Sequence, residues 1–158
     1  MNITLENILS LEPKATMPKT TMPKADHIAV CVPAECFYSF MQKIKTEFSF
    51  DFLLSHTAVD WQNSFELIYY LYSVLHKSYV LVSVSIPREN PHILSVQTLW
   101  RTAEFQEREV YDLFGVIYDN HPDLRRLFLE DEWQGFPLRK DYKDDFVLTP
   151  EMEKGLNE

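Results

Sequence analysis

The 158-residue sequence contains only two cysteines and no long apolar run. A structural zinc site needs four nitrogen or sulfur ligands and an iron–sulfur cluster usually four thiolates, so Cys31 and Cys36 cannot build either one alone. No stretch approaches the roughly 18 consecutive apolar residues of a membrane-spanning helix, and the first residues lack the pattern of a signal peptide. The sequence therefore predicts a cytosolic chain with reduced cysteines, which reaches a membrane only through partners.

Motifs that would indicate chemistry are also missing. The sequence has no G-x-G-x-x-G, no P-loop and no G-x-S-x-G, and none of its five histidines lies in a metal-ligand spacing such as H-E-x-x-H. We therefore expect no catalytic residues, no cofactor-binding residues and no metal site in this chain.

Positive charge is scarce as well. The chain has 15 Lys and Arg against 24 Asp and Glu, a formal net charge of −9. An acidic surface repels phosphate backbones and anionic lipid, so we expect no nucleic-acid partner and no direct membrane docking. With 46% hydrophobic and 14% aromatic residues, the chain has enough apolar material for a folded domain.

The hydrophobic pattern predicts three regions: an N-terminal arm at 1–24, an α+β domain at 25–118 and an extended C-terminal tail at 119–158. Strands are expected at 27–32, 50–59, 65–74 and 79–86, and helices at 37–47 and 99–114. Short turns between the later strands favour a mainly antiparallel sheet with helices packed on one face. The arm repeats Thr-Met-Pro-Lys at 16–19 and 21–24, and either lies on a partner or is a mobile terminus.

The densest charge group lies on the last predicted helix. Glu107 and Glu109 are two residues apart, so their carboxylates should diverge, which is poor geometry for an acid/base pair. Glu104, Arg108 and Asp112 form one i, i+4 column instead. We interpret this column as a solvated or interface face.

Two basic doublets, Arg125-Arg126 and Arg139-Lys140, lie in the predicted tail among acidic and aromatic residues. Arginine beside aromatic side chains in extended backbone is typical of protein–protein contacts. The tail is thus expected to pack on a partner or on its own last helix, although a solvated tail with occasional surface ion pairs is the simpler alternative.

The sequence from Glu107 to Val116 resembles the signature of the 30-kDa subunit of NADH:quinone oxidoreductase (respiratory complex I). The resemblance continues through 121–127 and 133–142. It departs from the family pattern at Phe105, Phe136 and Lys143, where tryptophan, histidine and proline are usual, which leaves the branch of the family open. The residues that carry the signature, and that we predict to form a partner interface, are Glu107, Arg108, Glu109, Tyr111, Asp112, Gly115, His121, Pro122, Arg125, Arg126, Trp133, Gly135, Pro137, Arg139, Lys140, Asp141 and Tyr142.

This resemblance implies a non-catalytic structural subunit in the peripheral arm of a proton-translocating NADH:quinone oxidoreductase. It implies packing against the large quinone-module subunit and the small cluster-bearing subunit, on the cytoplasmic side of the inner membrane. Iron–sulfur clusters, flavin and quinone are expected in those partners. The alternatives are the equivalent subunit of a related complex (an energy-converting hydrogenase, or a ferredoxin- or F420-linked dehydrogenase), a soluble adaptor, or a stand-alone enzyme using Glu107, Arg108, Glu109 and His121.

Overall fold

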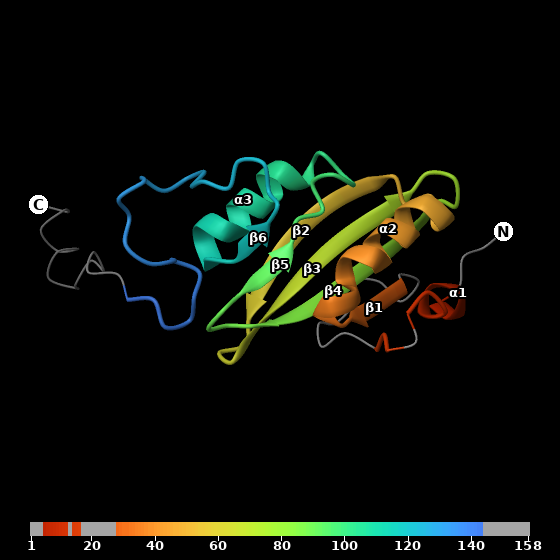
Figure 1. The fold of residues 1–158 in the computed structure, drawn as a ribbon, viewed down its shortest axis with the longest axis horizontal. Helices are drawn as coiled ribbons and strands as arrows, with labels where there is room; N and C mark the ends of the chain where they lie inside the picture. The colour runs from red at the N-terminus through yellow and green to blue at the C-terminus, as the bar shows by residue number, and fades with distance from the viewer. Residues whose placement is uncertain (1–4, 13, 17–27, 144–158) are drawn as a thin grey trace, which may run out of the picture.

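The computed structural model describes residues 5–12, 14–16 and 28–143, and its centre is a four-stranded mixed sheet (Figure 1). The strands are β1 (Ile28–Val32), β2 (Phe52–Asp60), β3 (Ser64–Ser73) and β4 (Ser78–Pro87), in the spatial order β1-β4-β3-β2. Strands β2, β3 and β4 pair antiparallel, while β1 pairs parallel to β4. The α+β class and the mainly antiparallel sheet are confirmed.

The helices are α1 (Leu5–Leu9), the short 3-10 helix η1 (Ala34–Cys36), α2 (Phe37–Phe48) and α3 (Ala103–Phe114). Helix α1 lies at one end of the sheet, and the chain after α3 lies at the opposite end (Figure 1). In α2, Phe37, Phe40, Met41 and Ile44 are buried at helical spacing, and the helix ends at Ser49 in the left-handed conformation.

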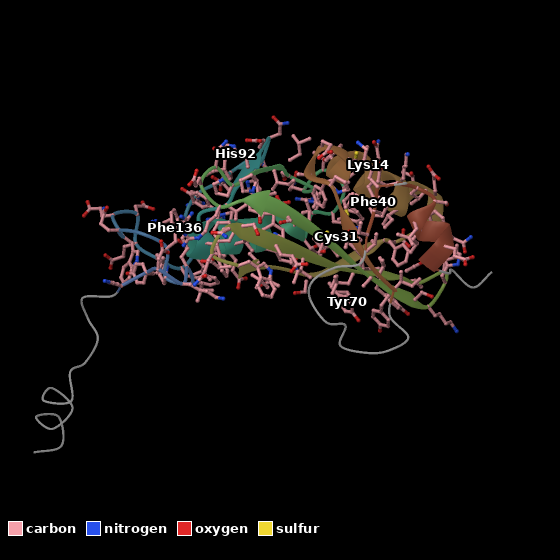
Figure 2. The ribbon with its side chains drawn as sticks, turned by 90° about the horizontal axis from the view of Figure 1, so that it is seen from below. Lys14, Cys31, Phe40, Tyr70, His92 and Phe136 are labelled. Carbon is pink, nitrogen blue, oxygen red and sulfur yellow. The ribbon has the colours of Figure 1, made fainter. Side chains whose placement is uncertain are left out.

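One face of the sheet carries the main core. Apolar residues of α2 and α3 share one cluster with the inward residues of the strands, such as Leu67, Val82 and Val30. A smaller cluster of Ala29, Ile68 and Leu81 lies on the other face. Figure 2 shows Phe40 of α2 and Tyr70 of β3 on opposite sides of the sheet. The predicted placement of the helices on one face is confirmed.

A second, two-stranded parallel sheet was not predicted. It pairs β5 (His92–Leu94) with β6 (Ile117–Asp119), which flank α3 in the sequence. Strands of three residues are too short to show a period, so no sequence pattern indicates them. Helix α3 begins at Ala103, later than the expected residue 99, because Trp100 and Ala103 close tight turns on Val96 and Trp100. The Trp100 indole then donates 3.0 Å to the Phe50 carbonyl.

Strand β6 places Tyr118 against His56 of β2, a buried histidine on the core side of the sheet. His56 of β2 lies 2.6 Å from the Tyr118 hydroxyl through Nε2 and 3.0 Å from the Ile68 carbonyl through Nδ1. Its ring stacks on Tyr69, with centroids 4.0 Å apart. Burial lowers the pKa of His56 to about 4, so the ring is neutral at physiological pH.

The predicted arm and tail fall partly outside the described residues. Within the arm, α1 is present with Ile8 buried, and Thr16 forms a single antiparallel bridge with Cys31 at the edge of the sheet. Residues 17–24 and 144–158 are not described, so the predictions for them stay predictions. Across the described part of the chain, no helix has the length and apolar character needed to cross a bilayer.

Candidate functional site

The candidate site is the face of α3 together with residues 120–143, which we call the strap. The strap contains no helix or strand, and Figure 1 shows it as a loop at the end of the molecule opposite α1. Its backbone is hydrogen-bonded to α3 and to the nearby end of the sheet. Figure 2 shows Phe136 within the strap, at the end of the molecule away from α1. Nearly all the residues of the sequence signature lie on α3 or in the strap.

Glu107 of α3 points into the protein and is fully buried. Its carboxylate accepts a hydrogen bond of 2.6 Å from the Ser95 hydroxyl and one of 2.8 Å from the Val96 N–H. His121 Nε2 lies 3.9 Å from the same carboxylate and 3.0 Å from the Glu104 carbonyl. Burial raises the pKa of Glu107 to about 7, against the lowering effect of the Ser95 and Val96 hydrogen bonds.

Glu109 lies on a different side of the helix and is exposed. The predicted divergence of the Glu107 and Glu109 carboxylates is confirmed, so the two do not form an acid/base pair. Tyr111 is half-buried and packs against the main core.

Asp112 is the main anchor of the strap. One carboxylate oxygen accepts hydrogen bonds from three consecutive backbone N–H groups, those of Leu127, Phe128 and Leu129, at 3.1, 2.7 and 3.0 Å. The other accepts 2.8 Å from the Arg126 guanidinium. Burial alone would raise the pKa of Asp112, but these bonds hold it below its usual range.

Arg126 ties together two turns of the strap. Besides its ion pair with Asp112, it donates to the backbone carbonyls of Trp133 and Gly135, at 2.9 and 3.2 Å. Arg108 does similar work from α3, donating to the carbonyls of Arg125 and Arg126 at 3.1 and 2.9 Å.

These contacts exclude one of the two alternatives, a solvated or an interface face, that the sequence left open for a column of charges on α3. The column of Glu104, Arg108 and Asp112 is not a solvated face, because Arg108 and Asp112 are 5% and 0% exposed and Glu104 is half-buried. The physical reason is that the strap covers them and uses both as hydrogen-bond partners for its own backbone. The sequence left open whether the tail packs on a partner or on its own last helix, and residues 120–143 pack on that helix.

A close crossing at Gly115 holds the far end of the strap. Gly115 ends α3 in the left-handed conformation, with φ of 74°. A Cβ there would lie 2.5 Å from the Phe136 ring and 2.6 Å from the Arg139 guanidinium, so only glycine fits. Arg139 donates 2.5 Å from Nε to the Phe114 carbonyl, the last of the helix, where a cation is favourable.

The strap also contacts the turn between β2 and β3. Asp60, which is 3% exposed, accepts 3.0 Å from the Lys140 N–H and pairs with Arg88 at 3.3 Å. Arg88 in turn pairs with Asp141. The Lys140 ammonium lies 5.8 Å from the centre of the Trp61 ring, so this doublet is also engaged within the chain.

The remaining signature residues have smaller roles. Arg125 is exposed and pairs with Asp123 at 2.9 Å, and the Asp123 N–H donates to the His121 ring. Gly135, with φ of 82°, lies against the Tyr142 ring. Trp133, Pro137 and Tyr142 are half-buried and Pro122 is exposed.

Sequence reasoning missed two residues that hold the site together, Asp60 and Arg88. Each lies far along the chain from its partner, up to 80 residues for Asp60 and Lys140, so no local pattern connects them. Within the described residues, no three His, Cys, Asp or Glu side chains gather as a metal site would require. Arg108, Asp112 and Asp60 instead hold the strap against the rest of the chain.

Comparison with known proteins supports the family resemblance found in the sequence. The family model described as "Respiratory-chain NADH dehydrogenase, 30 Kd subunit" matches residues 30–145. The C subunit of the NADH-quinone oxidoreductase of Moorella thermoacetica is 39% identical over 73% of this chain and 79% of its own length. The fused C/D subunit of Phocaeicola vulgatus is 43% identical over 75% of this chain, but the matched region is only 23% of that longer protein.

Two solved structures have a similar fold. A trypsin-resistant fragment of Nqo5 has a TM-score of 0.65 and 30% identity, covering 76% of this chain and 96% of the fragment. A chain of the membrane-bound sulfane sulfur reductase, an archaeal respiratory membrane complex, has a TM-score of 0.76 and 26% identity, covering 98% of this chain and 89% of its own.

The first prediction concerns two buried groups with opposite effects on stability. In the unfolded chain His56 takes up a proton near pH 6.5, but in the folded chain only near pH 4. His56 therefore lowers the free energy of unfolding as the pH drops from 6.5 to 4. In the unfolded chain Glu107 loses its proton near pH 4.5, but in the folded chain only near pH 7. Glu107 therefore lowers the free energy of unfolding as the pH rises from 4.5 to 7. Each effect is about 3 kcal/mol over its whole window.

Between pH 4.5 and 6.5 the two slopes oppose each other, so the wild type should show a nearly flat urea midpoint. Glu107→Gln should be progressively more stable as the pH rises through this range, and His56→Gln progressively less stable. Equal slopes for all three proteins would contradict the assignment.

The second prediction concerns the strap anchor. Asp112→Asn removes the charge that accepts three backbone N–H groups and pairs with Arg126, and should cost about 3 kcal/mol of unfolding free energy. Trypsin should then cut at Arg125 and Arg126 faster than in the wild type. Asp131→Asn, an exposed residue of the same strap, is the matched control and should change neither quantity. If both variants behave alike, Asp112 does not anchor the strap.

Proposed function

Because the chain belongs to the family of the 30-kDa subunit of respiratory-chain NADH dehydrogenase, we propose that it is a non-catalytic scaffold of such a complex. The family is that of a subunit of NADH-quinone oxidoreductases, and its members work within multi-subunit assemblies. The observation that supports a scaffold role is the use of the signature. Arg108, Asp112, Arg126 and Arg139 bind the chain's own backbone and so fix the course of the strap.

Among its charged and polar surface residues, the strap leaves two large apolar side chains exposed. Phe128 is 65% exposed and Leu138 52%, although both are large hydrophobic residues. Large apolar side chains held out from an ordered surface indicate a contact with another protein. We propose that this surface packs on the large quinone-module subunit, near the small cluster-bearing subunit.

The rest of the proposal rests on the family. The complex is a proton-translocating NADH:quinone oxidoreductase, and this subunit lies on the cytoplasmic side of the inner membrane, held there by its partners. It contributes no catalytic residue, and clusters, flavin and quinone belong to the partners. The likeness to a chain of an archaeal respiratory membrane complex supports a second candidate, the equivalent subunit of a related complex with a different electron donor.

The test of assembly uses the exposed residues of the strap. Phe128→Ser and Leu138→Ser should leave the stability of the isolated chain within about 0.5 kcal/mol, because neither side chain is buried. Both should lower the amount of assembled complex on native gels, while turnover per assembled complex stays normal. Leu75→Ser, at a 71% exposed position in the β3–β4 turn, is the matched control and should do nothing.

Normal assembly of the two strap variants would contradict the proposed surface. Full assembly with a large loss of turnover would indicate instead that the strap acts in the chemistry. A tagged chain purified from native membranes should bring down cluster-bearing subunits, and the identity of the electron-donor subunit then decides between the two candidate complexes.

The isolated chain should be colourless and free of metal. The reason is the absence of nucleotide and metal motifs in the sequence together with the absence of a metal-ligand group in the described residues. An absorption spectrum and metal analysis of the pure protein provide the measurement, and stoichiometric iron, zinc or flavin would overturn the expectation.

A further inference from the structure

A hollow lies where the strap meets the end of the sheet. Its volume is about 410 Å³, and it opens between the β2–β3 turn, the end of β4 and the strap. The residues that line it are Gln62, Asn63, Pro87, Arg88, Glu89 and Arg139. A neighbouring hollow of about 250 Å³ shares Gln62 and Arg88 with it.

Arg139 lines this hollow without an anionic partner from the described residues. Its Nε donates to the Phe114 carbonyl, and its guanidinium lies 5.2 and 4.6 Å from the ring centres of Phe65 and Phe136. Within the same described part of the chain, no carboxylate forms an ion pair with it and no other acceptor bonds its Nη groups. A guanidinium carries five N–H donors, so most of its hydrogen-bonding capacity is unused.

The neighbouring arginines differ in this respect. Arg88 pairs with two aspartates, Arg126 with Asp112, and Arg125 with Asp123. Burial, and then the nearby charge of Arg88, lower the pKa of Arg139, while the charges of Asp141 and Asp60 raise it. The net shift is downward, which means that its surroundings within the chain still disfavour the cation. An anion placed in the hollow would relieve this.

We propose that the hollow binds the carboxylate of an aspartate or glutamate side chain from a partner subunit, with Arg139 as its main ligand. This inference rests on the proposed function, since it requires a partner on the strap. The outer guanidinium nitrogens suit a carboxylate bidentately, and the side-chain amides of Gln62 and Asn63 add donors from the facing turn. The two aromatic rings fix the plane of the guanidinium, so little side-chain freedom is lost on binding.

Glu89 is the acidic residue of the lining and the competitor within the chain. It is exposed and makes no ion pair with Arg139, although both line the same hollow. The experiment must therefore distinguish a partner's carboxylate from Glu89.

The test uses the complex purified through a tag on this chain, carrying Arg139→Lys. A water-soluble carbodiimide joins an amine to a carboxylate in contact with it and adds no spacer, and peptide mass spectrometry locates both ends of the link. We expect an inter-subunit link from position 139 that the wild-type complex lacks. Asn63→Lys, on the opposite wall of the hollow, is the second variant and should link to the same partner peptide.

Arg125→Lys is the matched control, because Arg125 is exposed and already paired with Asp123. Its link should stay within this chain, to Asp123. If the complex is recovered intact but positions 139 and 63 link only to Asp60, Glu89 or Asp141, or form no link, the proposed docking is wrong while the scaffold role stands. If the wild-type chain recovers no partner subunits at all, it is the proposed function that fails.

Discussion

The course of the strap depends first on a single buried carboxylate, that of Asp112. The strap has no secondary structure, so its backbone N–H and C=O groups need partners from elsewhere. Asp112 satisfies three consecutive N–H groups with one oxygen and holds Arg126 with the other. Arg126 then binds two further carbonyls of the strap. An uncompensated charge at this position would be very costly, so strap and helix are stable only together.

The same exchange explains why some charged signature residues are buried, whereas Glu109, Arg125, Lys140 and Asp141 stay exposed. Arg108 and Arg126 direct their donors to main-chain carbonyls, and Asp112 directs its acceptors to main-chain N–H groups. These charged side chains satisfy backbone N–H and C=O groups, as the hydrogen bonds between strands do in a sheet. Side chains that take no part in this, such as Phe128 and Leu138, are left on the outside. In the proposed function, the signature fixes the course of the strap, and the exposed apolar side chains of the strap supply the contact with the partner.

Prediction from sequence was accurate for helices and strands with a regular apolar period, and it failed for contacts between residues far apart in the sequence. Helix α2 and strands β2 to β4 were located within about two residues, because apolar alternation and helical spacing report directly on a one-sided core. The three-residue strands β5 and β6 carry no period and were missed. The burial of Arg108 could not be inferred, since an i, i+4 column looks the same whether water or a strap covers it. Asp60 and Arg88 were missed because their partners Lys140 and Asp141 lie more than 50 residues away in the sequence.

Of the four residues on which the rival interpretation as a stand-alone enzyme depends, Glu107 and His121 lie together in the interior, with 3.9 Å between the carboxylate and Nε2. Glu107 faces Ser95 and the Val96 N–H in the interior, while Glu109 lies in solvent on another side of α3. Arg108 is occupied by two strap carbonyls, and the His121 ring bonds the Glu104 carbonyl and accepts from the Asp123 N–H. Acid/base chemistry needs such groups to converge on an accessible substrate, with a proton donor and acceptor within hydrogen-bond reach of it. Glu107, Arg108 and His121 instead complete the hydrogen bonding of neighbouring segments, which agrees better with the proposed docking surface than with acid/base chemistry.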